Sequence, residues 1–336
     1  MSRVIVFGAG GYLGIPLVEE LVKRGHEVFA RDRWFFGKFT TGAKIGTTDI
    51  RSPETYWNDV PYGIDAIIDL AGLSNDASAD IDPNLTTSIN LQGAIRLATL
   101  ANEVGVRKYI YSSSCSVYGS GGHDGLTETD DCNPQTAYAR SKLGVEDHLR
   151  SIASPDFDPI ILRNATVFGV APRMRFDLAV NIMTLRAWRD NLIYCMGGGK
   201  QFRPFIHVND VVRAFVLALE HDGYLNDTFN VGFDDMNLSI EQLAGMVKTV
   251  FPIAPIHHIP DDPDRRSYHV SFAKIRETFP FKTEYTILDG INEVRQALID
   301  GKISGDDETC YTVSWYRKLM DWEKRLNEIR LDGRIL

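Results

Sequence analysis

The sequence has few of the features that would direct a protein to a membrane, to nucleic acid or to a metal. No apolar run approaches the roughly 18–20 residues that a membrane helix needs, and the first residues lack the apolar segment of a secretory signal. The net charge is −9 and the sequence has no basic run, so nucleic-acid binding is not expected. The four cysteines, at positions 115, 132, 195 and 310, form no CxxC motif, so we expect neither a metal site nor a disulfide framework. A cytoplasmic protein is the expectation.

Short apolar runs alternate with amphipathic helical patterns through the first half of the chain. This alternation is typical of βαβ units, and it predicts an α/β fold with a doubly wound parallel sheet of the Rossmann type. The expected strands are 3–7, 27–31, 65–72, 107–114 and 158–169, and the expected helices include 15–25 and 93–105.

The second half of the chain is less regular. Segments 210–221 and 239–251 have helical patterns, 227–232 has the pattern of a strand, and the proline-rich segment 252–266 is expected to be a loop. Residues 306–336 contain a charged helical pattern for which the sequence predicts no role.

A glycine-rich turn, GAGGYLG, follows the first expected strand and opens the first expected helix. Its spacing is GxxGxxG, with Gly8, Gly11 and Gly14, because Leu13 stands where GxGxxG would require glycine. Glycine lets the backbone approach a pyrophosphate at the N-terminus of a helix. Asp32 ends the second expected strand, where a carboxylate can hold the hydroxyls of an adenosine ribose. Together these elements predict a dinucleotide site.

The residues around Asp32 leave the choice of dinucleotide open. Its carboxylate would repel a 2′-phosphate and therefore favours NAD, whereas Arg31 and Arg33 could accommodate that phosphate in NADP. We expect NAD. The aromatic residues 34–36 either pack over the adenine or cover a loop.

Tyr138 and Lys142 stand four residues apart in the segment YARSK and would share one face of a helix. A free tyrosine has a pKa of about 10 and is a poor base at neutral pH. A neighbouring ammonium and an oxidised nicotinamide both favour the phenolate, and lowering the pKa by about 3 units takes about 4 kcal/mol. Such a tyrosine could take a proton from a sugar hydroxyl while a hydride leaves the same carbon. The preceding segment SSSCSVYG ends an expected strand, at the edge where open parallel sheets bind ligands.

Taken together, these segments resemble the extended short-chain dehydrogenases/reductases, and among them the NAD-dependent nucleotide-sugar epimerases and dehydratases. The resemblance extends to about residue 300 and rests on GAGGYLG, Asp32, TDI (48–50), LAG (70–72), Asn90, SSSCSVYG, YARSK, LRNATVFG and RPFIHVNDV (203–211). It implies a nucleotide-diphosphate sugar as substrate and a homodimer formed through helices 90–105 and 136–150.

The resemblance also implies roles for single residues. Ser114 matches the catalytic Ser/Thr of the family, Tyr138 its base, and Lys142 the partner of that base on the nicotinamide ribose. The residues implied in cofactor binding are Gly8, Gly11, Tyr12, Leu13, Gly14, Asp32, Arg33, Asp49, Ile50, Leu70, Ala71, Gly72, Asn90, Ser112, Tyr138 and Lys142.

Arginines are implied in binding the substrate. Arg203, together with Arg266 or its neighbour Arg265, matches family residues that grip the diphosphate through charge-assisted bidentate hydrogen bonds. Thr166 stands where the family usually has Asn, and Asn164 comes two residues early, which puts that substrate contact in doubt.

Two clusters depart from the family pattern. Arg173, Arg175 and Asp177 either recognise the nucleotide or a charged sugar group, or form ion pairs on the surface. Ser74 and Asn75, after the strand 65–72, could contact the sugar.

The two residues after Ser114 indicate the reaction. Resembling 4,6-dehydratases carry Asp-Glu there and nucleotide-sugar decarboxylases carry Glu at the second place, but this chain has Cys115 and Ser116. The 3,5-epimerases and fucose synthases carry cysteine at the second place, so we expect Cys115 to face the interior and Ser116 the site. Because the residues that those other reactions use are missing, the resemblance implies hydride transfer at sugar C4, and a 4-epimerase is the expected activity. A 4-dehydrogenase or 4-keto reductase, a 4,6-dehydratase and a non-catalytic dinucleotide-binding scaffold are the alternatives.

These assignments predict the domain organisation. An NAD(P)-binding Rossmann domain is expected over residues 1–165, with 205–232 returning to it, and a mainly substrate-binding domain of mixed α/β structure over 166–330.

Overall fold

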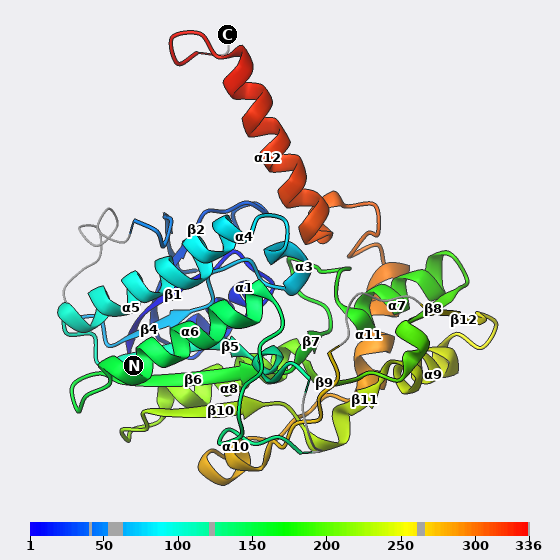
Figure 1. Ribbon diagram of the computed structural model, residues 1–336, viewed down its shortest axis with the longest axis horizontal. Coiled ribbons are helices and arrows are strands. Elements are labelled where there is room, and N and C mark those ends of the chain that lie inside the picture. The colour runs from blue at the N-terminus through cyan, green and yellow to red at the C-terminus, as the bar shows by residue number, and fades with distance from the viewer. Residues whose placement is uncertain (40–41, 53–62, 121–124, 261–265, 335–336) are drawn as a thin grey trace.

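The computed structural model describes residues 1–39, 42–52, 63–120, 125–260 and 266–334. Within them, seven parallel strands form one sheet with the order β10–β6–β5–β4–β1–β2–β3, which runs outward from β1 in both directions (Figure 1). The predicted doubly wound α/β fold is confirmed. The strands are β1 Arg3–Phe7, β2 Glu27–Asp32, β3 Lys44–Thr47, β4 Ala66–Asp69, β5 Lys108–Ser114, β6 Asp158–Asn164 and β10 Asp227–Val231.

Helices cover both faces of this sheet because its strands bury side chains on both. In β1, Val4 and Val6 belong to one core and Ile5 and Phe7 to the other, and all four are fully buried. The first core is closed by α1 and α8, and the second by α5 and α6. These helices are α1 Gly14–Lys23, α5 Ala94–Glu103, α6 Ala137–Ile152 and α8 Val208–Glu220.

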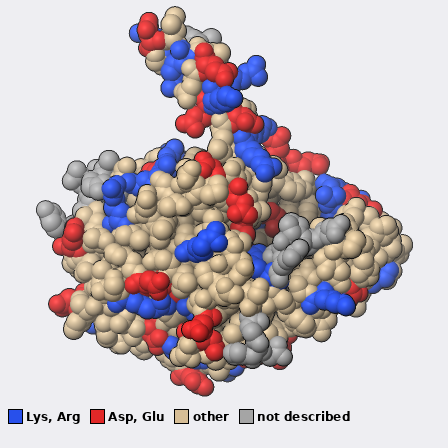
Figure 2. Space-filling view, in the orientation of Figure 1, with Lys and Arg blue, Asp and Glu red and all other residues tan. Residues whose placement is uncertain are grey.

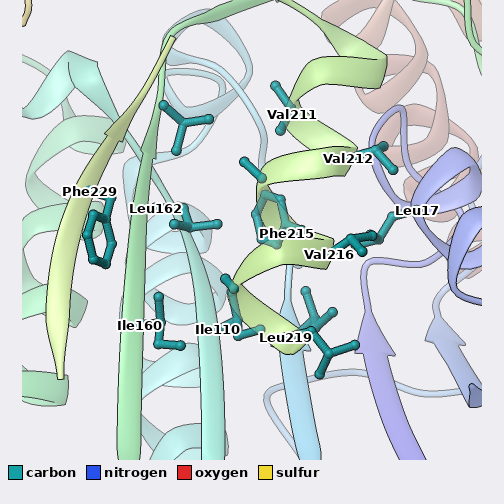
Figure 3. Close-up of a cluster of buried hydrophobic side chains, with 14 of the residues drawn as sticks. Leu17, Ile110, Ile160, Leu162, Val211, Val212, Phe215, Val216, Leu219 and Phe229 are labelled. Carbon is teal, nitrogen blue, oxygen red and sulfur yellow. The ribbon is translucent and has the colours of Figure 1, made fainter. Parts of the chain in front are cut away.

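The apolar residues of α8 show how one helix joins two elements. They recur at the helical spacing Val211, Val212, Phe215, Val216 and Leu219 (Figure 3). Phe215 points toward the strands β5 and β6, while Val216 points toward Leu17 of α1 (Figure 3). Burial of this face therefore fixes α8 against the sheet and against α1 together.

Part of the sheet comes from the second half of the chain. β10 follows α8 in sequence but pairs with β6 at the edge of the sheet. The division of the chain at residue 165, with 205–232 returning to the first domain, stays a prediction. α5 and α6 pack against each other, and a homodimer formed through them also stays a prediction.

The chain after β6 builds smaller sheets. The expected strand 158–169 is two strands, because the chain leaves the large sheet at Ala165 and β7 pairs with β9 instead. The segment 252–266 was expected to be a loop, and this is wrong for residues 256–259, which form β12 beside β8. Its prolines stand at positions 252, 255, 260 and 263, outside the strand, and therefore do not interrupt the ladder.

The elements not yet given bounds are the strands of the smaller sheets and further helices. They are β7 Thr166–Phe168, β8 Ile193–Met196, β9 Phe202–His207, β11 Asn237–Ser239, β12 Ile256–Ile259, α3 Asp76–Ala79, α4 Pro83–Thr86, a π-helix Thr87–Gly93, α7 Ala179–Arg189, α9 Ile240–Val250, α10 Ala273–Thr278 and α11 Ile287–Ile299.

The last helix, α12 Thr312–Ile329, protrudes from the body of the molecule (Figure 1). Thr312 at its base is fully buried, whereas every described residue from Asp321 onward is exposed. Charged side chains of both signs cover the protruding part (Figure 2). No helix in the described ranges is both long enough and apolar enough to cross a bilayer.

Candidate active site

A cavity of 1220 Å³ lies at the carboxyl ends of the parallel strands. Its walls include the residues that directly follow β1, β2, β4 and β6, and residues of the smaller sheets. This is the place where ligands bind to open parallel sheets.

The cavity brings together almost all of the predicted site residues, whose roles stay predictions. Those that line it are Gly8, Gly11, Tyr12, Leu13, Gly14, Asp32, Arg33, Asp49, Ile50, Leu70, Ala71, Gly72, Ser74, Asn75, Ser112, Ser114, Ser116, Tyr138, Lys142, Thr166, Arg173, Arg175, Arg203 and Arg266. Arg265, the alternative to Arg266, lies outside the described residues. Asn90 is not among the lining residues, because its carboxamide bonds the backbone N–H and C=O of Leu73 behind the cavity wall.

The glycine turn has no room for side chains. Gly8 has a φ of +76°, and a Cβ there would lie 2.7 Å from the carbonyl carbon of Leu70. A Cβ on Gly14 would lie 2.1 Å from the carbonyl oxygen of Gly8. The turn therefore exposes its backbone at the start of α1, where a helix N-terminus favours phosphate. It fits the diphosphate of a dinucleotide.

Asp32 is positioned by the backbone on both sides of it. Its carboxylate oxygens accept hydrogen bonds from the N–H groups of Gly10, at 3.0 Å, and Trp34, at 2.6 Å. A carboxylate has about four acceptor positions, so it can still accept from ribose hydroxyls. Burial raises the pKa of Asp32, and these N–H groups oppose that rise.

The two arginines beside Asp32 are already engaged with other groups. Arg31 donates to the carbonyl of Lys44 at 3.0 Å, and Arg33 forms an ion pair with Asp49 at 2.6 Å. Burial alone would raise the pKa of Asp49, but Arg51 and Arg33 bond its carboxylate and hold the pKa well below its usual range. These contacts engage both guanidinium groups with protein oxygens, which favours NAD over NADP.

The aromatic residues after Asp32 have separate places. Trp34 donates through its indole to the carbonyl of Gly46 at 3.1 Å and does not line the cavity. Phe35 and Phe36 do line it, and their rings meet the ring of Tyr316 from α12 at 6.1 and 5.6 Å. The base of α12 thus reaches the cofactor side of the cavity.

Tyr138 and Lys142 share one face of α6, as their spacing predicts. The side chain of Thr136 accepts from the N–H of Ala139 at 3.1 Å and starts this helix directly before Tyr138. Lys142 donates to the carbonyl of Ser112 at 2.7 Å, and its ammonium lies 5.7 Å from the centre of the Tyr138 ring. Burial lowers the pKa of Lys142 to about 8, while the carboxylates of Asp69 and Glu146 act in the opposite direction.

Tyr138 is buried, and its phenol interacts with the side chain of Ser114. Burial raises the pKa of the Tyr138 phenol, and this interaction opposes the rise. Without an added positive charge the phenol is therefore protonated at neutral pH. The arrangement can transfer a proton once nearby cations stabilise the phenolate.

Cys115 lies in the interior and Ser116 lines the cavity, as the sequence predicts, but the alternation of side chains along a strand is not the cause. They form a 3₁₀ turn rather than a strand, and the Ser114 hydroxyl accepts from the N–H of Ser116 at 3.2 Å. Cys115 is buried and donates to the carbonyl of Arg163 at 3.1 Å, and burial raises its pKa above the usual range for a thiol. The interior place predicted for Cys115 is confirmed.

Five residues that line the cavity carry a buried polar atom with no hydrogen-bond partner among the described residues, and two of these atoms lie near Ser114. These two are the hydroxyl of Ser116 and the side-chain oxygen of Asn164, both buried. Asn164 lies opposite Ser114 in the register of β5 and β6, and its amide donates to the Ser112 hydroxyl at 3.1 Å. Buried polar groups normally find partners, so these atoms are candidates for contacts with a ligand.

Arg203 and Arg266 meet at one wall of the cavity. Arg203 donates to the backbone carbonyl of Arg266, and its guanidinium lies 5.5 Å from the centre of the Tyr268 ring. Arg266 forms an ion pair with Asp76 at 2.5 Å. The carboxylate of Asp76 also accepts from the Thr136 hydroxyl, next to Tyr138.

The cluster of Arg173, Arg175 and Asp177 is not on the surface. Arg175 forms a buried ion pair with Asp177 at 2.7 Å, and Asn75 donates to the same carboxylate at 2.6 Å. Arg173 is 4% exposed. The alternative of a surface ion-pair cluster is therefore wrong.

A model of the NAD dependent epimerase/dehydratase family matches residues 4–232. The chain belongs to this family. NAD is therefore its cofactor, as the occupied arginines beside Asp32 also indicate.

Relatives in this family differ in their reactions. The UDP-glucose 4-epimerase of Mycolicibacterium smegmatis is 29% identical over 86% of this chain and 96% of its own. UDP-glucuronic acid decarboxylase 1 of Arabidopsis thaliana is also 29% identical, over 86% of this chain and 68% of its own. The structure of the UDP-glucose 4-epimerase from Thermotoga maritima has a TM-score of 0.81, with 23% identity over 90% of this chain and 100% of that one. The similarity to the Thermotoga maritima structure shows that the two proteins have the same fold.

Sequence reasoning did not find several residues of this family member's cavity. Asp76 and Tyr268 line it, and both stand within two residues of predicted site residues, so closer attention to those segments would have found them. Asn164 ends a strand of the parallel sheet, which is itself a signal. Tyr316 gave no signal, because its contacts with Phe35 and Phe36 span the whole chain.

Proposed function

We propose that this enzyme acts on a nucleotide-diphosphate sugar at C4 of the sugar ring and inverts that centre, as a 4-epimerase. The observation that carries the proposal is the arrangement around Tyr138. Tyr138 and Ser114 line the same cavity, Lys142 lies beside the Tyr138 ring, and neither Cys115 nor Ser116 is an acid that could assist elimination.

Each residue of this arrangement has one task. The Ser114 hydroxyl orients the 4-hydroxyl of the sugar, and the Tyr138 phenolate takes its proton. The Lys142 ammonium favours that phenolate by its charge. NAD, when bound, would supply a reversible acceptor for the hydride of the same carbon. After the sugar has turned over in the cavity, Tyr138 gives the proton back, so that no atom is gained or lost.

The substrate half of the cavity supports a nucleotide diphosphate. Arg203 and Arg266 stand at one wall with the Tyr268 ring beside them, and guanidinium groups bind phosphates with bidentate geometry. Arg266 is paired with Asp76, so a bound diphosphate would replace the Asp76 carboxylate as the partner of the Arg266 guanidinium. The unpartnered hydroxyl of Ser116 and amide oxygen of Asn164 are available for the sugar.

The relatives leave a second candidate reaction to be compared. The matched decarboxylases act on UDP-glucuronic acid by name. In the resembling decarboxylases, Glu occupies the place of Ser116, and a hydroxyl cannot replace that carboxylate as a proton carrier at neutral pH. The epimerase proposal is therefore better supported.

The experiment is to incubate the purified enzyme with a panel of UDP-, GDP-, CDP- and dTDP-sugars. Product stereochemistry is read by NMR, and reduced cofactor by absorbance. We expect one sugar to be epimerised at C4 with no net formation of NADH. A 4-keto product with persistent NADH would instead establish a 4-dehydrogenase, a 4-keto-6-deoxy product a 4,6-dehydratase, and loss of CO2 a decarboxylase. If the protein binds NAD but converts no sugar nucleotide, the remaining interpretation is a non-catalytic dinucleotide-binding scaffold.

A further inference from the structure

Arg173 is a buried cation of the cavity that the proposed reaction does not use. It lies between β7 and α7. One terminal nitrogen donates to the hydroxyl of Thr312, at the base of α12, at 2.8 Å. The guanidinium carbon lies 3.8 Å from the centre of the Phe36 ring, which is cation–π contact. Two rigid supports thus hold the group in place.

The Nε of Arg173 is unusual in this setting. It is buried and has no hydrogen-bond partner in the described part of the chain. Leaving a charged donor unpaired in the interior is costly, so native proteins rarely do so without a function. The acid of the same cluster does not complete it, because Asp177 bonds Arg175 through both of its oxygens. The cluster therefore has a surplus of positive charge.

The supports of Arg173 place it on the cofactor side of the cavity. Phe36 follows four residues after Asp32, whose carboxylate is expected to hold the adenosine ribose. The charge of Arg173 opposes the rise in the pKa of Asp32 that burial causes, so the two groups act on each other. The substrate arginines belong to other elements, since Arg203 lies on β9 and Arg266 beside Tyr268.

The electrostatics point to an anion as the missing partner. Burial lowers the pKa of Arg173 to about 10, and the charge of Arg175 acts in the same direction. An anion between these arginines would remove both penalties. The expected anion nearest to Asp32 is the diphosphate of the dinucleotide, which the glycine turn presents at the start of α1.

We propose that Arg173, supported by Thr312 and Phe36, binds the diphosphate of NAD, and that the base of α12 is therefore part of the cofactor site. This revises the expectation that Arg173 contacts the substrate. The proposal depends on NAD as cofactor and not on the reaction at C4.

The test measures binding rather than turnover. The protein is freed of cofactor, and NAD, ADP and UDP are titrated separately by calorimetry. For Arg173→Gln we expect at least a tenfold weaker affinity for NAD, because one charge-assisted hydrogen bond is lost. ADP, which carries the same diphosphate, should weaken by a similar factor. UDP, the probe for the substrate half, should change by less than twofold.

Two further variants protect the result against a folding defect. Thr312→Val leaves Arg173 in place but removes one of its supports, and we expect about a threefold weaker affinity for NAD. Arg317→Gln changes an exposed arginine of α12 and should leave all three affinities unchanged. Thermal melting of the cofactor-free proteins shows which variants are folded.

Three outcomes would overturn the proposal. An unchanged NAD affinity in Arg173→Gln would remove Arg173 from the cofactor site. A loss of UDP affinity alone would return it to the substrate. Equal losses for NAD and UDP would make it a residue of the cavity wall without selectivity. If Arg173→Gln does not fold, an unchanged NAD affinity in Thr312→Val has the same force.

Discussion

At the residue scale, the pKa of Tyr138 depends on a balance between burial and charge. Burial raises the pKa, and the interaction with Ser114 lowers it. Lys142, whose own pKa is about 8, is mostly charged at pH 7 and also favours the phenolate. The tyrosine is therefore a base only while its cationic neighbours are in place.

The first prediction concerns the Tyr138 hydroxyl itself. In Tyr138→Phe we expect turnover to fall by at least about 100-fold, because the group that accepts the proton is lost. NAD affinity should stay within twofold. The matched control is Tyr111→Phe, since the Tyr111 hydroxyl is buried without a partner among the described residues and its loss leaves no atom unpaired. Equal turnover in Tyr138→Phe and the native protein would contradict the catalytic account.

The second prediction concerns pH. Replacing Lys142 by Met removes an ammonium that lies 5.7 Å from the centre of the Tyr138 ring, so we expect the pKa of Tyr138 to rise. The rising limb of kcat/KM against pH should move to higher pH by about one unit or more, since about 1.4 kcal/mol corresponds to one unit. The pH profile is the measurement. A lower rate with an unmoved midpoint would mean that Lys142 only positions the cofactor.

At the element scale, a buried ion pair joins α6 to the large sheet. Glu146 stands one helical turn after Lys142 and bonds Arg163 of β6 at 2.7 Å, with both side chains almost fully buried. The same carboxylate accepts from the Ser113 hydroxyl at 2.5 Å, next to Ser114. The pair therefore fixes the distance between the helix that carries Tyr138 and the strand that carries Ser114.

The third prediction follows from this pair. Glu146→Ala leaves the Arg163 guanidinium buried and unpaired, and should lower the free energy of unfolding by about 3–5 kcal/mol. Denaturant titration measures it. Asp147→Ala is the control, because its exposed side chain makes a surface ion pair worth about 1 kcal/mol or less. A change in Glu146→Ala no larger than in the control would show that the pair contributes little.

Elements also show where sequence reasoning succeeds and where it ends. The strands around Val4 and Ile110 are predictable because they are short, apolar and bounded by turns, and the site residues at their ends follow from that. The sequence does not predict β12, because the prolines on both sides of it indicate a loop although they stand outside the strand. For Asn90 the resemblance implies a structural or a cofactor contact, and its bonds to Leu73 arise only in the folded chain. Contacts of that kind leave no periodic signal.

At the scale of the whole molecule, α12 has two parts with different surroundings. Its base contacts Phe35, Phe36 and Arg173, whereas residues 321–334, the last that the structure describes, are all exposed. If the base of α12 belongs to the cofactor site, removal of the base should weaken NAD binding, whereas removal of the exposed part should not.

The fourth prediction compares two shortened proteins. A chain ending after Met320 keeps Thr312 and Tyr316 and should bind NAD within about twofold of the full chain. A chain ending after Tyr311 loses both and should bind NAD at least tenfold more weakly, while its UDP affinity stays close to that of the full chain. Calorimetry on cofactor-free protein measures both. Equal NAD affinity in the two shortened chains would contradict the assignment.

The contact between Phe36 and Tyr316 also constrains how the protein is made. About 280 residues separate these rings in the sequence. At translation rates of roughly 5–20 residues per second, the ribosome needs on the order of tens of seconds to deliver the second after the first. The Rossmann strands can pair during that interval, but the pocket for the dinucleotide remains open on one side. If the base of α12 belongs to the cofactor site, capture of NAD in its final form is thus a late event in biosynthesis, and the newborn chain must persist without that stabilisation until then.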